Sequence, residues 1–276
     1  MADLYFVVGS PVAHSLSPAM MTAAFEKIGR SAAYGRLEVG SADWPGVSRD
    51  LYERGVCGLN VTVPHKESAL RIAADATPVA RAIGAANTLL RGPSGWSADN
   101  TDGPGFLDRL RDSGAMDAVA AGALVLGAGG SARAIVWALR EAGCPRIRIA
   151  ARTSARAHGI ARAFPDATVD VEPEGGTAPE GGVVVNCTPL GLGPDDPLPI
   201  GRGRLHPAAH VFDLVYPVTG LVRAAGDAGI PAEHGLELLV AQGARSFRAW
   251  TGVEAPVAVM REAIVRELDR RGFPRE

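Results

Sequence analysis

The chain has 276 residues, of which 47% are hydrophobic, so it can form two folded domains with ample cores. Its formal net charge of −2 gives no electrostatic reason to expect a nucleic acid or a membrane surface as a partner. Three widely spaced cysteines without a CxxC pair, no apolar run of bilayer length and no signal peptide predict a cytoplasmic protein without a disulfide framework.

Strand and helix signals alternate almost throughout, which predicts an α/β fold with mainly parallel sheets. In the first part of the chain we expect strands at 4–9, 32–39 and 58–63 and helices at 17–29 and 42–55. Ser17 is the expected N-cap of the first helix, with Pro18 at its first helical position. Residues 87–92 and 95–100 predict a β-hairpin around a Gly-Pro-Ser-Gly turn.

The stretch "NVTVPHK" places polar groups at the end of the third predicted strand. Alternation puts Asn60 and Thr62 on one side of this strand and Val61 and Val63 on the other. Lys66 follows just beyond it and opens a helix-like pattern. These groups form either a polar binding edge or a solvated turn before a helix.

A second series of elements begins at about residue 104. An apolar strand runs into glycines over 122–130, followed by a helix at 131–143 and a strand at 146–153. The Pro/Gly-rich stretch 171–182 is predicted to be a surface loop, and 183–188 and 210–215 are predicted strands. The chain closes with predicted helices at 236–252 and 257–271.

The histidines of "HPAAH", His206 and His210, have the i,i+4 spacing of helical metal ligands. The motif lacks the glutamate of a zinc protease and lies in a proline-containing connection before a predicted strand. We therefore expect no metal site.

The segment "VLGAGGSARA" predicts a nucleotide site, because Gly127, Gly129 and Ala132 have the G-x-G-x-x-G/A spacing between a predicted strand and a helix. The first glycine permits a tight turn, the second lets the backbone approach a pyrophosphate, and the helix N-terminus attracts phosphates. The candidate phosphate-binding residues are Gly127, Ala128, Gly129, Gly130 and Ser131.

The end of the following strand indicates which dinucleotide is bound. NAD-binding units usually carry an acid there, whereas this chain has Arg152, Thr153 and Arg156. A carboxylate would repel a 2′-phosphate, whereas guanidinium groups can hold it, so the pattern favours NADP. The alternative is a pair of exposed arginines without a ligand.

The sequence resembles the shikimate dehydrogenases over nearly its full length. The motifs that carry the resemblance occur in order: "GSPVAHSLSPAM", "GLNVTVPHK", "AIGAANTL", "ADNTDGPGF", "GAGGSARA", "ART", "NCTPLGL", "DLVY" and "GLELLVAQ". The resemblance implies an N-terminal α/β substrate domain over 1–103, completed by C-terminal helices over 236–276, and a Rossmann-type NADP-binding domain over 104–235. It also implies an active site in the cleft between the domains, and reversible NADPH-dependent reduction of 3-dehydroshikimate to shikimate in aromatic amino-acid biosynthesis.

The same resemblance implies roles for individual residues. Lys66 and Asp102 would form the catalytic pair, and Ser15 and Ser17 would bind the substrate carboxylate, with Tyr216 nearby. Substrate hydroxyls would be held by Asn60, Thr62, Asn87 and Gln242. Further cofactor contacts would come from Asn186, Thr188, Leu214, Gly235 and Leu238.

Chemistry supports a lysine at the reacting group, because an ammonium can stabilise a nascent alkoxide and donate its proton. Asp102 would orient Lys66 and accept a hydrogen bond from a substrate hydroxyl, and either of the two residues could be the group that moves the proton.

Three positions depart from the family pattern: Ala151 replaces the asparagine before Arg-Thr, Leu238 replaces a methionine, and "YPVT" is two residues shorter than Y-x-P-x-x-T. Quinate or aminoshikimate therefore stay open as alternative substrates. A non-catalytic NADP-binding sensor is the alternative from another class. The expected partner is a small molecule, and the chain would be a monomer or a homodimer.

Overall fold

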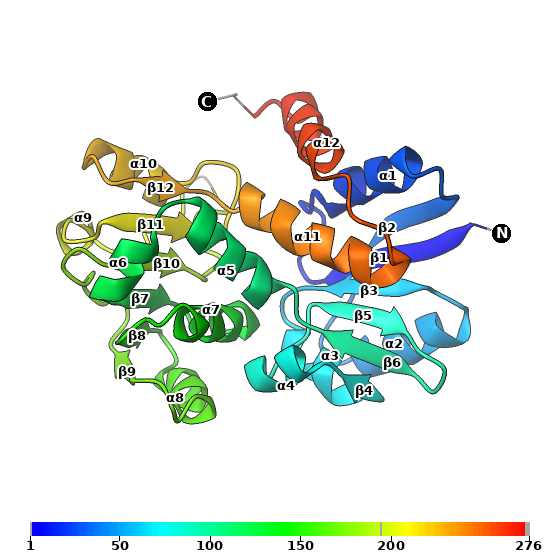
Figure 1. The fold of residues 1–276 in the computed structure, drawn as a ribbon, viewed down its shortest axis with the longest axis horizontal. Helices are drawn as coiled ribbons and strands as arrows, with labels where there is room; N and C mark the ends of the chain where they lie inside the picture. Colours follow the sequence, from blue (N-terminus) through cyan, green and yellow to red (C-terminus); the bar gives the residue numbers. More distant parts are fainter. Residues whose placement is uncertain (1, 194, 274–276) are drawn as a thin grey trace. The chain divides into compact units, whose positions relative to one another are not determined.

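The protein forms two compact units, each an α/β assembly, in a computed structural model that describes residues 2–193 and 195–273 (Figure 1). Unit 1 comprises Met1–Thr101 and Leu239–Glu276, and unit 2 comprises Asp102–Leu238. The predicted α/β class with mainly parallel sheets is confirmed, since each unit is built on one six-stranded sheet.

The sheet of unit 1 has the strand order β2-β1-β3-β5-β6-β4. Its strands are β1 (Asp3–Gly9), β2 (Ala32–Glu38), β3 (Gly58–Val61), β4 (Asp75–Ala76), β5 (Thr88–Arg91) and β6 (Trp96–Asp99). Only β5 runs against the others, because it pairs antiparallel with both β3 and β6. The predicted hairpin is therefore confirmed as β5–β6, and its turn is closed by the Gly92 N–H, which donates to the Gly95 carbonyl at 3.0 Å.

The helices of unit 1 come from both ends of the chain. They are α1 (Ser17–Lys27), α2 (Trp44–Glu53), α3 (Lys66–Ile72), α4 (Pro78–Ile83), most of α11 (Leu236–Thr251) and α12 (Val257–Arg270). Helix α11 closes an aromatic core, in which Trp250 lies 5.1 Å from Tyr5 and Phe247 lies 5.0 Å from Phe25 between ring centroids. A glycine is required at Gly58, since a Cβ there would lie 2.4 Å from Nε1 of Trp250.

Two local predictions in unit 1 were wrong by a short distance. Helix α1 begins at Ser17 and Leu16 occupies the N-cap position, so Ser17 is the first helical residue rather than the cap. The hydroxyl of Ser15 instead accepts the Ser17 N–H at 3.2 Å. Strand β3 ends at Val61 instead of Val63, whose side chain is 57% exposed beyond the paired region.

The sheet of unit 2 is parallel throughout and has the strand order β12-β11-β10-β7-β8-β9. Its strands are β7 (Ala123–Leu126), β8 (Ile147–Ala150), β9 (Val169–Glu172), β10 (Val183–Asn186), β11 (His210–Asp213) and β12 (Ala232–Glu233). Numbered within the unit, this is the order 3-2-1-4-5-6 of doubly wound dinucleotide-binding folds. The order reverses between β7 and β10, where such folds bind their ligands.

Helices cover the sheet of unit 2 and bury its apolar strands. They are α5 (Asp102–Asp112), α6 (Met116–Ala121), α7 (Gly130–Glu141), α8 (Ser154–Ala163), α9 (Arg202–Leu205) and α10 (Gly220–Asp227). Ile135 and Leu139 of α7, two residues of the predicted helical face, are fully buried against Val125 and Val185 in one core cluster.

The predicted surface loop 171–182 was wrong at its start and in its middle. Residues up to Glu172 belong to β9, which pairs with β8 at the edge of the sheet. This strand has a charged cross-strand partner, since Arg148 of β8 donates to Glu172 at 3.1 Å, and its four residues run directly into the Pro/Gly-rich stretch. Ala178 is only 4% exposed and packs in a core cluster with Leu124.

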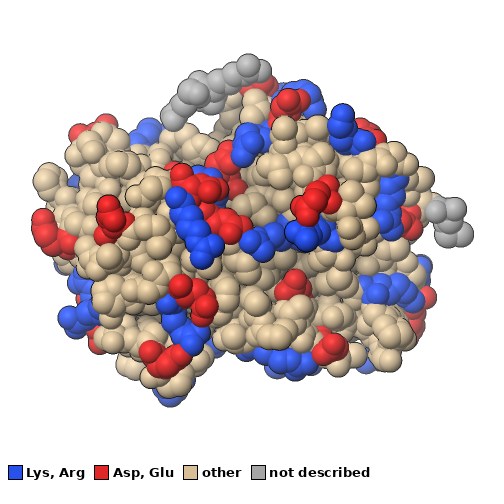
Figure 2. Space-filling model, viewed as in Figure 1, with Lys and Arg blue, Asp and Glu red and all other residues tan. Residues whose placement is uncertain are grey.

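The two histidines of "HPAAH" do not lie on one helix, because His206 follows α9 and His210 opens β11. Over the described residues, no helix has the length and apolar character needed to cross a membrane. Figure 2 shows basic and acidic side chains interspersed over the face in view, in keeping with the small net charge of −2.

Candidate active site

The segment between β1 and α1 presents two buried hydroxyls at a helix N-terminus. The exposed fractions of Ser15 and Ser17 are 7% and 5%. Because the Ser15 Oγ accepts the Ser17 N–H, the hydroxyl proton of Ser15 is available as a donor. Two hydroxyls and the first N–H groups of an eleven-residue helix are suited to an anion such as a carboxylate.

The side chain of Asn60 makes hydrogen bonds with four protein groups. Its Oδ1 accepts the Tyr34 hydroxyl at 2.6 Å, and its Nδ2 donates to Ser246 Oγ of α11 at 3.0 Å. The same Nδ2 lies 3.3 Å from the Asn87 carbonyl and 3.4 Å from Thr88 Oγ1. The orientation of this buried carboxamide is therefore set by the protein itself.

Asn87 connects the hairpin to α11 and to the end of unit 1. Its Nδ2 donates to Thr101 Oγ1 at 2.9 Å and to Gln242 Oε1 at 3.2 Å, while its Oδ1 accepts the Thr101 N–H at 2.8 Å. Gln242 is anchored in turn, because its Nε2 donates to the Leu239 carbonyl at 2.7 Å. Three of the predicted site residues, Asn60, Asn87 and Gln242, thus lie in one buried network.

Thr62 stands outside this network. It follows β3, and its N–H donates to the Val8 carbonyl at 2.9 Å. A Cβ placed on Gly9 would lie 2.3 Å from the Thr62 methyl carbon, so Gly9 leaves the room that Thr62 needs.

Lys66 is the first residue of α3, and its exposed fraction is 9%. The interpretation as a solvated turn is therefore wrong. Its carbonyl accepts the Ala86 N–H at 2.8 Å. On the other side, the His65 ring stacks on Trp44 at 5.0 Å and its Nε2 lies 2.7 Å from the Val39 carbonyl oxygen. The backbone at the lysine is thus fixed before and after the residue.

Sequence reasoning missed four members of the polar network, one of which, Thr88, lies directly after Asn87 in a quoted motif. Ser246 lies four residues after Gln242 on a predicted helix, and that spacing alone would have placed both on one face. Thr101 lies directly before Asp102 in a quoted motif. Tyr34 carried no signal, because one tyrosine in a predicted strand is ordinarily a packing residue.

In unit 2, two glycines of the turn after β7 differ in what they require. Gly127 has a backbone conformation that favours glycine, whereas Gly129 has open space where a side chain would be. Gly127 has φ +102°, and a Cβ there would lie 3.2 Å from the carbonyl carbon of Cys187 and from the Thr188 methyl. Gly129 is the N-cap of α7 with φ −101°, and no described atom beyond its chain neighbours would lie within 4 Å of its Cβ. Ala128, Gly130 and Ser131 complete the turn and open the helix.

The arginines after β8 are exposed at the start of α8, on either side of its N-cap Thr153. In the described part of the chain, neither the Arg152 nor the Arg156 guanidinium has an ion-pair or hydrogen-bond partner among the protein groups. Two guanidinium groups without a protein anion beside a helix N-terminus are suited to a phosphate.

A buried carboxylate connects the loops that follow β10 and β11. Asp213 Oδ1 accepts from Asn186 Nδ2 at 2.8 Å, and its Oδ2 accepts from the Thr219 hydroxyl at 2.6 Å. Asn186 in turn accepts the Thr188 hydroxyl at 2.7 Å. Burial raises the pKa of Asp213, although the hydrogen bonds from Thr219, Val215 and Asn186 act in the opposite direction. The shortened "YPVT" loop is thus anchored through its threonine.

The remaining predicted residues also belong to unit 2. Leu214 and Leu238 pack at the edge of the α7 core cluster, and Gly235 lies against Leu214, whose carbonyl oxygen would be 2.2 Å from a Cβ on the glycine. Asp102 is the first residue of α5, and Tyr216 follows β11.

Unit 2 fits a dinucleotide phosphate at several points. The glycine turn lies at the switch point of the sheet, the N-terminus of α7 opens from it, and two arginines stand at the end of β8. No carboxylate occupies positions 151–156, so a 2′-phosphate would meet no fixed negative charge there.

Two sequence models of protein families match the chain. Residues 7–89 match the shikimate dehydrogenase substrate binding domain, and residues 235–265 match the shikimate 5'-dehydrogenase C-terminal domain.

Individual relatives are similar over nearly their whole length. A shikimate dehydrogenase (NADP(+)) of Anaeromyxobacter sp. (strain Fw109-5) is 43% identical over 95% of both chains. The crystal structure of shikimate 5-dehydrogenase from Thermus thermophilus, in complex with NADP(H) and shikimate, is 36% identical with a TM-score of 0.83, covering 96% of this chain and 99% of that one. The ligand-free 5-ketofructose reductase of Gluconobacter sp. strain CHM43 is 28% identical with a TM-score of 0.82, covering 97% and 99%.

Proposed function

Because the chain belongs to the shikimate dehydrogenase family, we propose that it catalyses the reversible NADPH-dependent reduction of 3-dehydroshikimate to shikimate. The observation that supports this most is Lys66, a buried lysine whose backbone is fixed at the start of α3 in the unit that carries the substrate-domain match. We assign substrate binding to unit 1 together with Asp102 and Tyr216, and cofactor binding to the other predicted residues of unit 2.

In unit 1, Ser15 and Ser17 donate their hydroxyl hydrogens to the substrate carboxylate at the N-terminus of α1. The substrate hydroxyls are assigned to Asn60, Thr62, Asn87 and Gln242. Hydrogen bonds within the protein orient three of these side chains in advance, which reduces the reorganisation needed when the substrate binds.

Bound NADPH supplies a hydride to the carbonyl carbon of 3-dehydroshikimate. Lys66 stabilises the developing alkoxide with its ammonium group and donates the proton that completes the hydroxyl. In the reverse direction the neutral amine takes that proton back. Asp102 accepts a hydrogen bond from a neighbouring substrate hydroxyl, and Tyr216 contributes to the carboxylate site.

In unit 2, the N–H groups of 128–131 hold the pyrophosphate, and Gly127, whose own N–H donates to the Ala150 carbonyl at 2.8 Å, shapes the turn beside it. Arg152, Thr153 and Arg156 hold the 2′-phosphate of NADP. Asn186, Thr188, Leu214, Gly235 and Leu238 line the remaining cofactor surface. Ala151 lacks a side chain that can bond the ribose, so we expect both NAD and NADP to bind less tightly, without reversal of the preference.

The function is tested by initial rates with shikimate and with quinate, each with NADP and with NAD. We expect the highest kcat/KM for shikimate with NADP. A higher kcat/KM for quinate would reassign the substrate, and binding of NADP without any turnover would show a sensor. Reduction of 5-ketofructose is a further control, because one similar structure is a 5-ketofructose reductase. This ketone has no carboxylate, so we expect a much lower kcat/KM for it than for 3-dehydroshikimate.

A further inference from the structure

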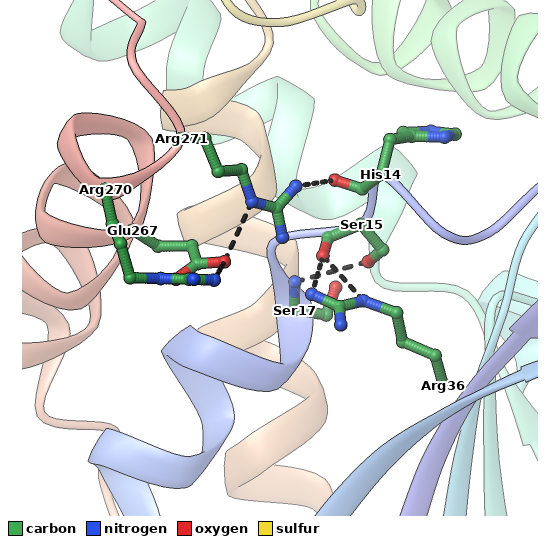
Figure 3. A network of polar contacts seen from close by, with 7 residues as sticks. All are labelled: His14, Ser15, Ser17, Arg36, Glu267, Arg270 and Arg271. Carbon is green, nitrogen blue, oxygen red and sulfur yellow. Dashed lines mark hydrogen bonds and ion pairs between the residues drawn. The ribbon is translucent and has the colours of Figure 1, made fainter.

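Two arginines from distant parts of the chain bind consecutive carbonyls of the segment that carries Ser15 (Figure 3). Arg36 of β2 donates from Nε at 3.0 Å and from Nη2 at 2.7 Å to the carbonyl oxygen of Ser15. Arg271, directly after α12, donates from Nη1 at 2.8 Å to the carbonyl oxygen of His14.

Arg271 is itself held in place by the last turn of α12. Its Nε donates to Glu267 Oε1 at 2.8 Å, and the same carboxylate accepts from Arg270. These hydrogen bonds with Arg270 and Arg271 lower the pKa of Glu267 to about 2, so the Glu267 carboxylate is ionised at neutral pH. The guanidinium that reaches His14 is therefore fixed by an ion pair.

These hydrogen bonds restrain the backbone from which the Ser15 side chain extends. The fork of two hydrogen bonds from Arg36 restrains the plane of the peptide that follows Ser15, and the single hydrogen bond from Arg271 restrains the preceding carbonyl. Ser15 Oγ then accepts the Ser17 N–H, which fixes the hydroxyl relative to the start of α1. Burial and the charges of Arg271 and Arg36 lower the pKa of His14, which indicates a positive potential along this segment.

We propose that Arg36 and Arg271 are positioning residues for the substrate carboxylate, which hold the hydroxyls of Ser15 and Ser17 in their binding orientation. Both guanidiniums reach the segment through its backbone, Arg36 at the Ser15 carbonyl oxygen and Arg271 at the His14 carbonyl oxygen. This inference rests on the proposed function, and it adds one residue of β2 and the residue directly after α12, both of which lie outside the motifs of the sequence.

The test compares Arg36→Met and Arg36→Lys in two backgrounds, the wild type and the double variant Ser15→Ala/Ser17→Ala. In the wild type, Arg36→Met should raise the KM for shikimate by roughly tenfold, the loss expected for one hydrogen bond to a charged group, with kcat changed less than about threefold. Arg36→Lys keeps the charge and one donor but loses the fork, so its effect should be smaller. Neither variant should change the KM for NADP.

In the Ser15→Ala/Ser17→Ala background, the same Arg36 substitutions should lower kcat/KM for shikimate by less than about twofold, because the hydroxyls that the arginine positions are absent. An equal factor in both backgrounds would overturn the proposal, since it would mean that the arginine acts on the substrate by its field or by direct contact. A parallel rise of the KM for NADP would also overturn it, because general loosening of the fold would then be the cause.

Arg271→Met should reproduce this pattern, and it carries the test alone if Arg36→Met does not fold. Arg266→Met is the matched control, because Arg266 is an α12 arginine that pairs with Glu262 and does not contact the segment in the described structure. Its KM for shikimate should stay unchanged. Absence of shikimate turnover in the wild type would refute the proposed function itself, and that outcome is distinct from additive effects in an active enzyme.

Discussion

Replacing Gly129 by alanine should separate the stability of the fold from binding of the cofactor. Gly129 has φ −101° and ψ −171°, a conformation open to any residue, and its Cβ would meet no described atom within 4 Å. Alanine is a poorer N-cap than glycine by up to about 1 kcal/mol, and the lower entropy of its unfolded chain returns about 0.4–1 kcal/mol. The free energy of unfolding should therefore change by less than about 1 kcal/mol.

The methyl group instead occupies the space through which a pyrophosphate approaches the N-terminus of α7. Losing one hydrogen bond to a charged group costs about 1.5–3 kcal/mol, so the Kd for NADP should rise by roughly tenfold to a hundredfold. Gly127→Ala is the contrasting variant, because φ +102° is strained for alanine and the backbone of Cys187 lies 3.2 Å from the new Cβ. That variant should lose at least about 2 kcal/mol of stability.

Urea unfolding of both variants without cofactor gives the stabilities, and fluorescence titration with NADPH gives the affinities. Reduced stability of Gly129→Ala would show that the turn is more crowded than the structure indicates. An unchanged Kd for NADPH in a stable Gly129→Ala variant would refute the assignment of the pyrophosphate to this turn.

Three further variants test other parts of the proposal. Lys66→Ala should lower kcat by at least about a hundredfold with a smaller change in the KM for shikimate, measured by initial rates; a steep rise in KM with an unchanged kcat would make the lysine a binding group only. Replacing Arg152 and Arg156 together by alanine should lower kcat/KM with NADP by about a hundredfold or less, given their exposure, and leave NAD use nearly unchanged; a parallel loss with both cofactors would contradict their role. Glu267→Gln should lower the free energy of unfolding at neutral pH, and the gap to the wild type should narrow as pH falls from about 4.5 to about 2; because the folded pKa is depressed, this contribution is present above the unfolded pKa and lost on protonation, so a gap that is constant with pH in acid unfolding curves would refute it.

Local chemistry made much of the fold predictable. The glycine turn after β7 and the β5–β6 hairpin each depend on a few adjacent residues whose backbone preferences are strong. Strand β9 was missed for a physical reason of the opposite kind. Val169 and Val171 do alternate with Asp170 and Glu172, but this edge strand has only four residues and runs directly into the Pro/Gly-rich stretch, so its pattern is too short to be distinguished from the loop.

The candidate site was predictable as a set of motifs and less so as a network. Asn60 and Ser246 are 186 positions apart, and His14 and Arg271 are 257 apart, so no local pattern relates them. Burial of Lys66 was likewise undecidable from its neighbours, because a lysine after a strand is usually solvated. These features arise from tertiary packing, in particular from the way α11 and α12 return to unit 1.

The discontinuity of unit 1 has a consequence for the order of events during synthesis. The aromatic core around Tyr5 and Phe25 needs Phe247 and Trp250, which leave the ribosome only after all of unit 2. At about 5–20 residues per second, the N-terminal segment waits on the order of ten seconds with an open core while unit 2 is translated. The first unit to be translated is therefore the last to be completed, and a nascent chain that stops before α11 exposes apolar surface of unit 1 to chaperones and proteases.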